Sequence, residues 1–297
     1  MNDTINASVL PYIIELHLVD HCNLNCAGCS HFAPLVKDEV FSDFNTFKRD
    51  LLRLRQIFSD VYEIRHMGGE PLLHPDINGF IEFSRQTFSK ANVSVSTNGV
   101  LLQNMPSVFW QTCAVNNVLV KLTNYPIRLD LSKIKQLGKS NRVRIKIPNQ
   151  VNAFFQFINI KGDSNPAHSF GNCRAMYTTP FLRDGKLYSC SFAPHVHLFN
   201  EYFDQDIPVT DGDYINILED VTPQQVHHFL ENPIPLCKWC KTMRPYVNWS
   251  RSKGDINEWI SGEANSFTHF FEIKRNAVIS AYHKIKQTSE MVQRNKQ

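Results

Sequence analysis

Three cysteines near the start of the chain have the spacing of a metal site. Cys22, Cys26 and Cys29 lie within eight residues of one another, too close for a disulfide framework but suited to surrounding one metal centre. Cysteine thiolates hold iron–sulfur clusters, and a [4Fe-4S] cluster with three protein ligands keeps one iron open for a small molecule. Structural zinc, which normally takes four protein ligands, and a loop of unrelated thiols are the alternatives.

Four further cysteines occur in the second half of the chain. Cys173 and Cys190 flank a predicted hairpin, and Cys237 and Cys240 form a Cys-x2-Cys pair. Two such pairs can tie distant segments together through a metal. Spacing alone leaves two interpretations open, because four thiolates suit tetrahedral zinc as well as a fully ligated iron–sulfur cluster.

Two short polar motifs follow predicted strands. The first is Gly68-Gly69-Glu70 and the second is Ser96-Thr97-Asn98. Paired glycines let the backbone approach a ligand, and the glutamate can accept a hydrogen bond from an ammonium group. The second motif offers hydroxyl and amide groups to a ribose or a carboxylate. Taken alone, each motif also suits an ordinary turn.

Hydrophobic patterning predicts the elements that position these groups. Residues 12–19 are apolar and rich in β-branched side chains, which predicts a buried strand that ends just before the first cysteines. Strands and helices then alternate. We expect helices over 46–58, 77–88, 107–113 and 131–137, and strands over 62–66, 92–96, 117–122 and 143–147. Repeated βα units imply an α/β fold with a parallel sheet, either a barrel or a doubly wound sheet.

The alternation ends after about residue 147, so a second unit is expected. The segment 161–172 is rich in Asn, Pro, Gly and Asp and is predicted to be a linker or long loop. A hairpin is expected around Asp184-Gly185, and residues 266–287 have helical character. The chain of 297 residues therefore divides into units over 1–160 and 161–250 and a helical tail over 251–297.

Polar residues at the ends of the fourth and fifth strands are candidates for substrate contacts, since barrel enzymes place active-site side chains there. The candidates are Lys121, Thr123, Asn124, Arg144, Lys146 and Asn149. Arg144 and Lys146 share one face of their strand. A solvated sheet edge is the alternative explanation for these charges.

Composition excludes several classes of protein. Hydrophobic residues make up 42% and charged residues 20% of the chain, which indicates a folded protein rather than a disordered one. A net charge of +3 is too small to indicate a nucleic-acid or membrane partner. The chain shows neither a signal peptide nor an apolar run of about 18 residues. We therefore expect a cytoplasmic protein, in which the cysteines are metal ligands or reactive thiols.

The Cys-x3-Cys-x2-Cys loop after the first strand resembles the signature of the radical S-adenosylmethionine superfamily. The resemblance implies a partial (β/α)6 TIM-like barrel over residues 1–160. It also implies that the open iron binds S-adenosylmethionine, with the Gly-Gly-Glu motif on its amino group and the Ser-Thr-Asn motif on its ribose or carboxylate. The family usually has an aromatic residue where this chain has Gly28, and Phe32 or another nearby aromatic residue is expected to substitute.

The second set of cysteines resembles the auxiliary-cluster module called Twitch, a shorter relative of the SPASM module. Gly185 stands at the expected place, and residues 241–249 lack the further cysteines of SPASM. The resemblance implies a β-hairpin and helix module over residues 161–250 with a second [4Fe-4S] cluster. The remaining cysteine, Cys113, falls in a predicted helix, where we expect a buried structural thiol rather than a hydrogen-atom donor.

The superfamily resemblance implies reductive cleavage of S-adenosylmethionine to a 5′-deoxyadenosyl radical, which abstracts a substrate hydrogen. An external one-electron donor such as flavodoxin or ferredoxin would supply the electron. A fully ligated second cluster favours two-electron oxidation, as in Twitch-bearing aminocyclitol dehydrogenases. We therefore expect an oxidoreductase that acts on a carbohydrate-like small molecule. The alternatives are radical modification of a peptide or protein and a non-enzymatic metal-binding or electron-transfer scaffold.

Overall fold

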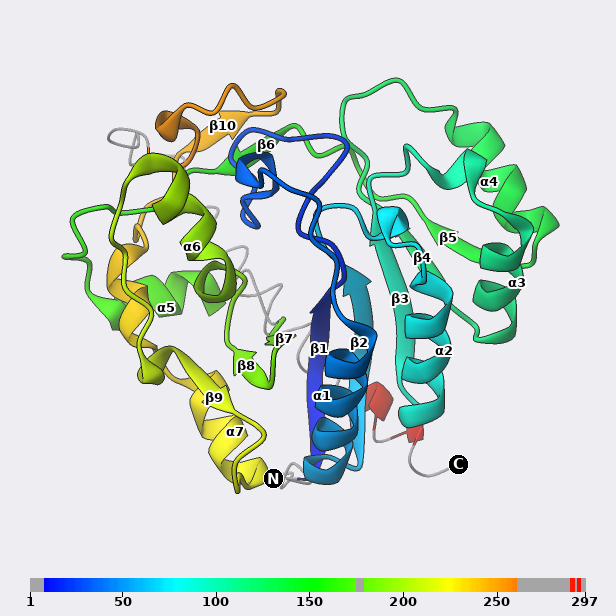
Figure 1. The fold of residues 1–297 in the computed structure, drawn as a ribbon, viewed down its shortest axis with the longest axis horizontal. Helices are drawn as coiled ribbons and strands as arrows, with labels where there is room; N and C mark the ends of the chain where they lie inside the picture. Colours follow the sequence, from blue (N-terminus) through cyan, green and yellow to red (C-terminus); the bar gives the residue numbers. More distant parts are fainter. Residues whose placement is uncertain (1–7, 175–178, 261–288, 292, 295–297) are drawn as a thin grey trace.

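An eight-stranded sheet runs through the computed structural model, which describes residues 8–174, 179–260, 289–291 and 293–294. The strand order is β5-β4-β3-β2-β1-β7-β8-β9, and helices pack along its outer side (Figure 1). The parallel strands of the first half are β1 (Val9–His17), β2 (Asp60–Met67), β3 (Asn92–Thr97), β4 (Leu119–Leu122) and β5 (Arg144–Lys146). The predicted α/β class and parallel sheet are thereby confirmed.

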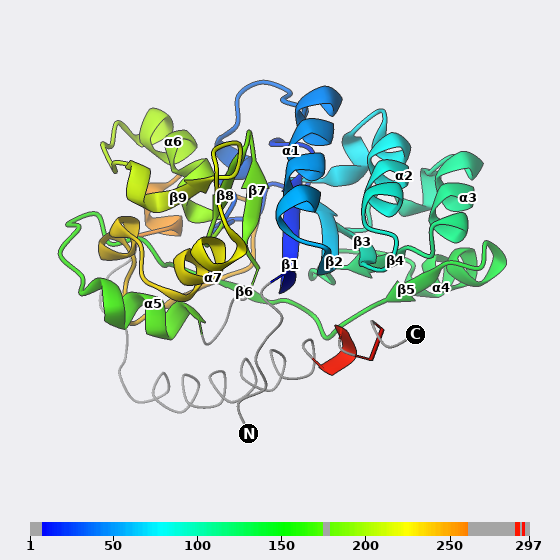
Figure 2. The same ribbon diagram turned by 90° about the horizontal axis from the view of Figure 1, so that it is seen from below.

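Four helices alternate with these strands, and α1, α2 and α3 lie along one side of them (Figure 2). The helices are α1 (Phe44–Ile57), α2 (Ile77–Thr87), α3 (Ser107–Val115) and α4 (Leu131–Ser140). Helix α1 shows why they form: the Asp43 side chain accepts a hydrogen bond from the Thr46 N–H group, which caps the first turn. Phe47, Leu51 and Leu54 then recur at helical spacing and are buried against the sheet.

The sheet continues beyond the first half of the chain. Strand β7 (Phe181–Arg183) pairs in parallel with β1, and β8 (Lys186–Tyr188) and β9 (Tyr214–Asn216) follow in antiparallel order. The predicted hairpin is confirmed, since Asp184 and Gly185 adopt φ values of 53° and 76° between its strands. The barrel sheet thus gains a sixth parallel strand from the segment that the sequence placed in a second unit.

The predicted linker over 161–172 is wrong in part, because α5 (Pro166–Arg174) occupies its second half. The Asn165 side chain accepts a hydrogen bond from the His168 N–H group at 3.1 Å, and proline follows at the first helical position. Asparagine and proline therefore begin a helix here rather than form a loop.

The remaining elements complete the C-terminal part, and the sequence did not predict them individually. They are α6 (Phe192–Phe203), α7 (Pro223–Glu231) and an antiparallel ribbon of β6 (Ala153–Phe155) with β10 (Tyr246–Asn248). Short 3-10 helices occur at Ala33–Leu35, Pro71–Leu73, Leu102–Asn104, Asp211–Asp213, Pro235–Trp239 and Ile256–Glu258. The predicted helix over 266–287 lies outside the described residues. Within the described part of the chain, no helix is long and apolar enough to cross a membrane.

Candidate functional site

A cavity of about 760 Å³ is the candidate site, a volume in the range of small-molecule pockets. Its wall comes from the sheet, from the loop that carries the first three cysteines and from C-terminal segments. Motifs far apart in the sequence therefore meet around one space. The cavity also receives residues from both predicted units.

Cys22, Cys26 and Cys29 all line this cavity. Burial raises the pKa of the Cys22 thiol to about 11 and that of Cys26 to about 12, and neighbouring charges, including the other thiolates of the loop, add to both shifts. Grouped thiols of this kind ionise readily only when a cation shares the site. The three thiols thus form a candidate ligand set whose deprotonation a metal centre would favour.

Gly68 and Gly69 lie where two loops touch. A Cβ atom on Gly69 would stand 2.1 Å from the His21 carbonyl oxygen, and one on Gly68 would stand 2.4 Å from the Val19 carbonyl oxygen. The Gly69 N–H group donates to the Val19 carbonyl at 2.6 Å. Only glycine permits this approach, so the pair holds the β2 loop against the chain that enters the cysteine loop.

Glu70 is fully buried and points toward the end of β3. Its carboxylate accepts hydrogen bonds from the Thr97 hydroxyl at 2.7 Å, the Asn98 N–H group at 2.8 Å and the Leu72 N–H group at 3.1 Å. Burial raises the pKa of Glu70 to about 7. Glu70 is not among the described residues that line the cavity, whereas Ser96, Thr97 and Asn98 are. The carboxylate therefore orients the second motif.

The Asn98 side chain connects that motif to the cysteine loop. Its amide group donates to the Asn23 side-chain oxygen at 2.7 Å and approaches Cys22 Sγ at 3.7 Å. The loops after β1, β2 and β3 are therefore linked by hydrogen bonds around one edge of the cavity. The predicted roles of these residues in binding a cofactor stay a prediction.

A network of charged side chains forms the wall on the sheet side. Arg65 donates to Glu15 at 2.9 Å and to Glu63 at 3.2 Å, and Lys121 bonds to Glu63. Burial lowers the pKa of Lys121 to about 8, and Arg65 adds to this effect. Although burial opposes ionisation of Glu63, the charges of Arg65 and Lys121 prevail and hold its pKa below the usual value.

Sequence reasoning missed three members of this network, namely Glu15, Glu63 and Arg65. A signal was present, because charged residues inside predicted strands at alternate positions point to one face. Of the predicted substrate residues, Lys121 and Lys146 line the cavity, as does Thr123. The other candidates, Asn124, Arg144 and Asn149, do not line it. Arg144 is exposed, and its side chain contacts the Asn117 side-chain oxygen at 3.3 Å.

Most of the second set of cysteines lies on the wall of the same cavity. Cys173, Cys190 and Cys240 line it. Cys237 is not among the lining residues, but burial raises the pKa of its thiol to about 12, and the charges of Cys190 and Cys173 add to the effect. The four thiols are therefore close enough to influence one another electrostatically.

Gly28 precedes the third cysteine, and side chains from other segments occupy the space beside it. Gly28 has φ 70°, and a Cβ atom on it would lie 2.6 Å from Val247 Cγ1 and 3.2 Å from Phe154 Cβ. Phe32 is fully buried among Phe199 and other aromatic residues and does not line the cavity. The aromatic residues that line the cavity are Tyr62, Tyr125, Phe154, Phe155, Phe157 and Phe192. Phe154 is the one that stands beside Gly28.

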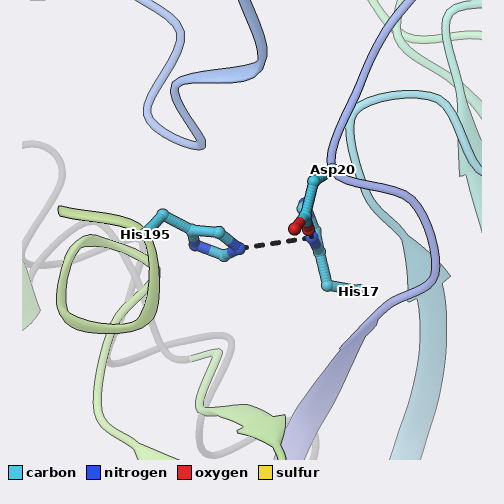
Figure 3. Close-up of side chains that lie close together, drawn as sticks. All are labelled: His17, Asp20 and His195. Carbon is cyan, nitrogen blue, oxygen red and sulfur yellow. Dashed lines mark hydrogen bonds and ion pairs between the residues drawn. The ribbon is translucent and has the colours of Figure 1, made fainter. Parts of the chain in front are cut away.

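A buried cluster of His17, Asp20 and His195 lies beside this site. His17 Nδ1 is 2.8 Å from Asp20 Oδ1 and 3.2 Å from His195 Nε2 (Figure 3). Three potential ligand atoms thus lie within 4.8 Å of one another. Arg183, however, donates to both carboxylate oxygens of Asp20 at 2.8 Å. A divalent cation would therefore add uncompensated positive charge in a buried place, and the cluster instead ties β1, β7 and α6 together.

Comparisons with known proteins bear on this geometry. No family model matches the chain. In sequence it is similar to the GTP 3',8-cyclases of Trichodesmium erythraeum, at 32% identity over 94 residues, and of Staphylococcus saprophyticus, at 32% identity over 99 residues. These matches cover 31% and 30% of this chain and 29% and 28% of the two cyclases. The chain therefore spans less than a third of the length of the curated relatives it matches.

In fold the chain is similar to native anSMEcpe with bound AdoMet, with a TM-score of 0.52, 13% identity and coverage of 93% of this chain and 99% of that one. The complex of anSMEcpe with AdoMet and the Cp18Cys peptide gives a TM-score of 0.51, 13% identity and coverage of 95% and 99%. At this level of identity the similarity shows a shared fold, in agreement with the expected partial TIM-like barrel.

Proposed function

Given that the chain has the fold and the three-cysteine loop of the radical S-adenosylmethionine superfamily, we propose that it cleaves S-adenosylmethionine reductively and removes a hydrogen atom from a substrate in the cavity. The observation that carries this proposal is the position of Cys22, Cys26 and Cys29 on the wall of that cavity, beside Thr97 and Asn98. The similarities to GTP 3',8-cyclases and to AdoMet-bound anSMEcpe support it.

The number of thiols in each set supports iron–sulfur clusters. Three thiols leave one iron of a [4Fe-4S] cluster open for a small molecule, so we assign one such cluster to Cys22, Cys26 and Cys29. A second, fully ligated cluster is assigned to Cys173, Cys190, Cys237 and Cys240, in a Twitch-like module.

S-adenosylmethionine and a reduced cluster together supply cleavage of a carbon–sulfur bond and abstraction of a hydrogen atom. The chain's own residues would bind the cofactor and orient it. Gly68 and Gly69 keep the backbone close to the cysteine loop, while Ser96, Thr97 and Asn98 present hydroxyl and amide groups to a ribose or carboxylate. Glu70 has about four acceptor positions and uses three of them on protein donors, so its main task is to hold Thr97 and Asn98.

The polar wall supports a hydroxyl-bearing, carbohydrate-like substrate. Oxidation of such a carbon removes one hydrogen atom, one proton and one further electron. Lys121 lines the cavity with a pKa of about 8, which suits it to exchange a proton with a hydroxyl group near neutral pH. The second cluster would take the electron, because three of its four thiols line the same cavity. An external one-electron donor, such as flavodoxin or ferredoxin, would reduce the first cluster.

A peptide substrate is the second candidate. It rests on the similarity to anSMEcpe, which has been solved with the Cp18Cys peptide. The charged wall formed by Glu15, Arg65 and Glu63 favours the carbohydrate-like molecule instead, because it offers several hydrogen bonds to a compact polar ligand. A scaffold without catalysis is the third candidate, and the open iron position implied by only three thiols in the first set counts against it.

Anaerobic reconstitution with iron and sulfide tests the proposal. The protein should contain about eight irons per chain, whereas one cluster plus one zinc would give about four. With dithionite and S-adenosylmethionine it should form 5′-deoxyadenosine, measured by liquid chromatography and mass spectrometry, and Cys26→Ala should abolish that product. A fully loaded wild-type protein that forms none would contradict the proposal. Candidate substrates are then compared by the deuterium they transfer into 5′-deoxyadenosine.

A further inference from the structure

Residues 246–259, the covering segment, lie across the loop that holds the first three cysteines. The Ala27 N–H group donates to the Ser250 carbonyl at 2.9 Å, and the Ser252 N–H group donates to the Asn25 carbonyl at 2.8 Å. Cys26 and Arg251 form an antiparallel bridge. A segment more than two hundred residues away thus pairs with the cysteine loop by its backbone.

Side chains complete this contact. The Trp259 indole N–H group donates to the Cys29 carbonyl at 2.9 Å, and Val247 occupies the space in which a side chain at Gly28 would stand. The loop and the covering segment are therefore shaped for each other. The segment therefore contacts the cysteine loop through its backbone and through its side chains.

One contact reaches a sulfur directly. Trp249 Nε1 lies 3.1 Å from Cys26 Sγ and donates its hydrogen to it. An indole N–H group is a donor only, and its direction here is set by two further contacts. The Trp249 backbone N–H group bonds to the Asn152 carbonyl at 2.8 Å, and its ring stacks on Tyr125 at 6.2 Å between centroids. The Cys26 residue is 6% exposed, so little of it is open to solvent.

The sulfurs of Cys22 and Cys29 have other hydrogen-bond donors. Cys22 accepts a longer contact from the Leu24 N–H group at 3.4 Å and one from Asn98 at 3.7 Å. The hydrogen bonds found at Cys29 come from backbone N–H groups beside it in the chain. Within the described residues, Trp249 is thus the side-chain donor with the shortest contact to any sulfur of this set.

We propose that Trp249 raises the reduction potential of the centre held by Cys22, Cys26 and Cys29, through its N–H···S hydrogen bond to Cys26. Reduction adds negative charge to the cluster and its sulfurs, so a donor to sulfur stabilises the reduced state more than the oxidised one. Trp249 acts through Cys26 and is a positioning residue. The inference rests on the proposed cluster but not on the identity of the substrate.

The test compares Trp249→Phe with wild-type protein in a potentiometric titration followed by electron paramagnetic resonance. Binding of S-adenosylmethionine should perturb the spectrum of the centre with the open iron and so identify it. We expect a more negative reduction potential in the variant. At a fixed solution potential, its ratio of reduced to oxidised cluster should be about threefold to tenfold smaller than in wild-type protein, and a tenfold change corresponds to about 59 mV for one electron. Trp110→Phe, in α3 and buried in the barrel core, is the matched control and should leave the potential unchanged.

Two further measurements decide between a hydrogen bond and mere packing. Trp249→His keeps a ring N–H donor and should shift the potential less than Trp249→Phe; equal shifts would overturn the proposal. In Trp259→Phe protein labelled with ¹⁵N in its indole rings, which lacks the other indole beside the cysteine loop, pulsed spectroscopy should detect nitrogen coupled to the reduced centre; its absence would overturn the proposal even if the Trp249→Phe variant binds no iron. A wild-type protein without iron at these cysteines would instead refute the proposed function itself.

Discussion

Glu70 shows how one side chain organises the site. It is fully buried and receives three hydrogen bonds from the ends of two neighbouring loops. A carboxylate is needed because both of its oxygens face donors. The residue therefore links the Gly-Gly-Glu turn to Thr97 and Asn98 more directly than it faces the cavity.

Glu70→Gln should destabilise the protein by about 1–3 kcal/mol, because the amide must direct an N–H group at a donor and leave it unpaired. Urea unfolding measures this change. Glu201→Gln, on the exposed face of α6, is the matched control and should change the stability by less than about 0.5 kcal/mol. Equal effects of the two substitutions would show that Glu70 does not have this structural role.

His66 is a second informative residue. It is fully buried on β2, and neither ring nitrogen has a hydrogen-bond partner among the described residues. Burial lowers its pKa to about 3. The folded state therefore keeps His66 neutral, whereas the unfolded chain takes up a proton below about pH 6.5. This contribution to stability is present above pH 6.5 and is lost as the pH falls toward 3.

We expect the free energy of unfolding to fall by up to about 1.4 kcal/mol per pH unit from this residue below pH 6. His66→Leu should flatten that part of the pH profile, measured by urea unfolding between pH 7 and pH 5. His197→Leu, at an exposed position of α6, should keep the wild-type slope. An unchanged slope in His66→Leu would show that other groups control the fall in the free energy of unfolding at acidic pH.

At the scale of elements, the covering segment and the cysteine loop meet without space for a side chain at Gly28. Its φ of 70° and the 2.6 Å approach of Val247 both require glycine. Gly28→Ala should therefore destabilise the protein by about 1–3 kcal/mol and reduce iron loading of the first site, measured by unfolding and metal analysis. Gly171→Ala, in α5 with no atom within 4 Å of the added carbon, should be neutral or stabilising.

A double variant, Gly28→Ala with Val247→Ala, separates the steric contact from the backbone strain. Val247→Ala removes the Cγ1 atom that an added carbon at Gly28 would meet, so it should recover part of the loss in the double variant. The strain of the left-handed backbone would remain. If the double variant is no better than Gly28→Ala, the conformation of the loop rather than the contact with the covering segment explains the glycine.

At the scale of the whole molecule, cysteines from both sets line one cavity. We expect Cys190→Ala to lower the iron content from about eight to about four per chain, because three thiols hold a fully ligated cluster poorly. Formation of 5′-deoxyadenosine should persist, whereas net oxidation of the substrate should be lost. Metal analysis and product assays check both results. Loss of both activities with the first site fully loaded would contradict an electron-accepting role for the second site.

The sequence by itself determined those features that depend on residues close together in the chain. Cys22, Cys26 and Cys29 fall in one short loop whatever the rest of the chain does, and the βα alternation up to residue 147 follows from the spacing of apolar residues. The hairpin at Asp184-Gly185 was also predictable, because its turn needs residues that tolerate positive φ.

Only the tertiary structure decided how distant groups meet. Long-range pairing brings β7 beside β1, brings Lys121 to Glu63, and lays the covering segment over the cysteine loop. None of these contacts leaves a periodic signal in the chain, because each depends on packing between segments far apart in sequence. Gly28 illustrates the difference. In the sequence it stands where the family usually has an aromatic residue, and in the folded protein Val247 occupies the space that a side chain at this position would need.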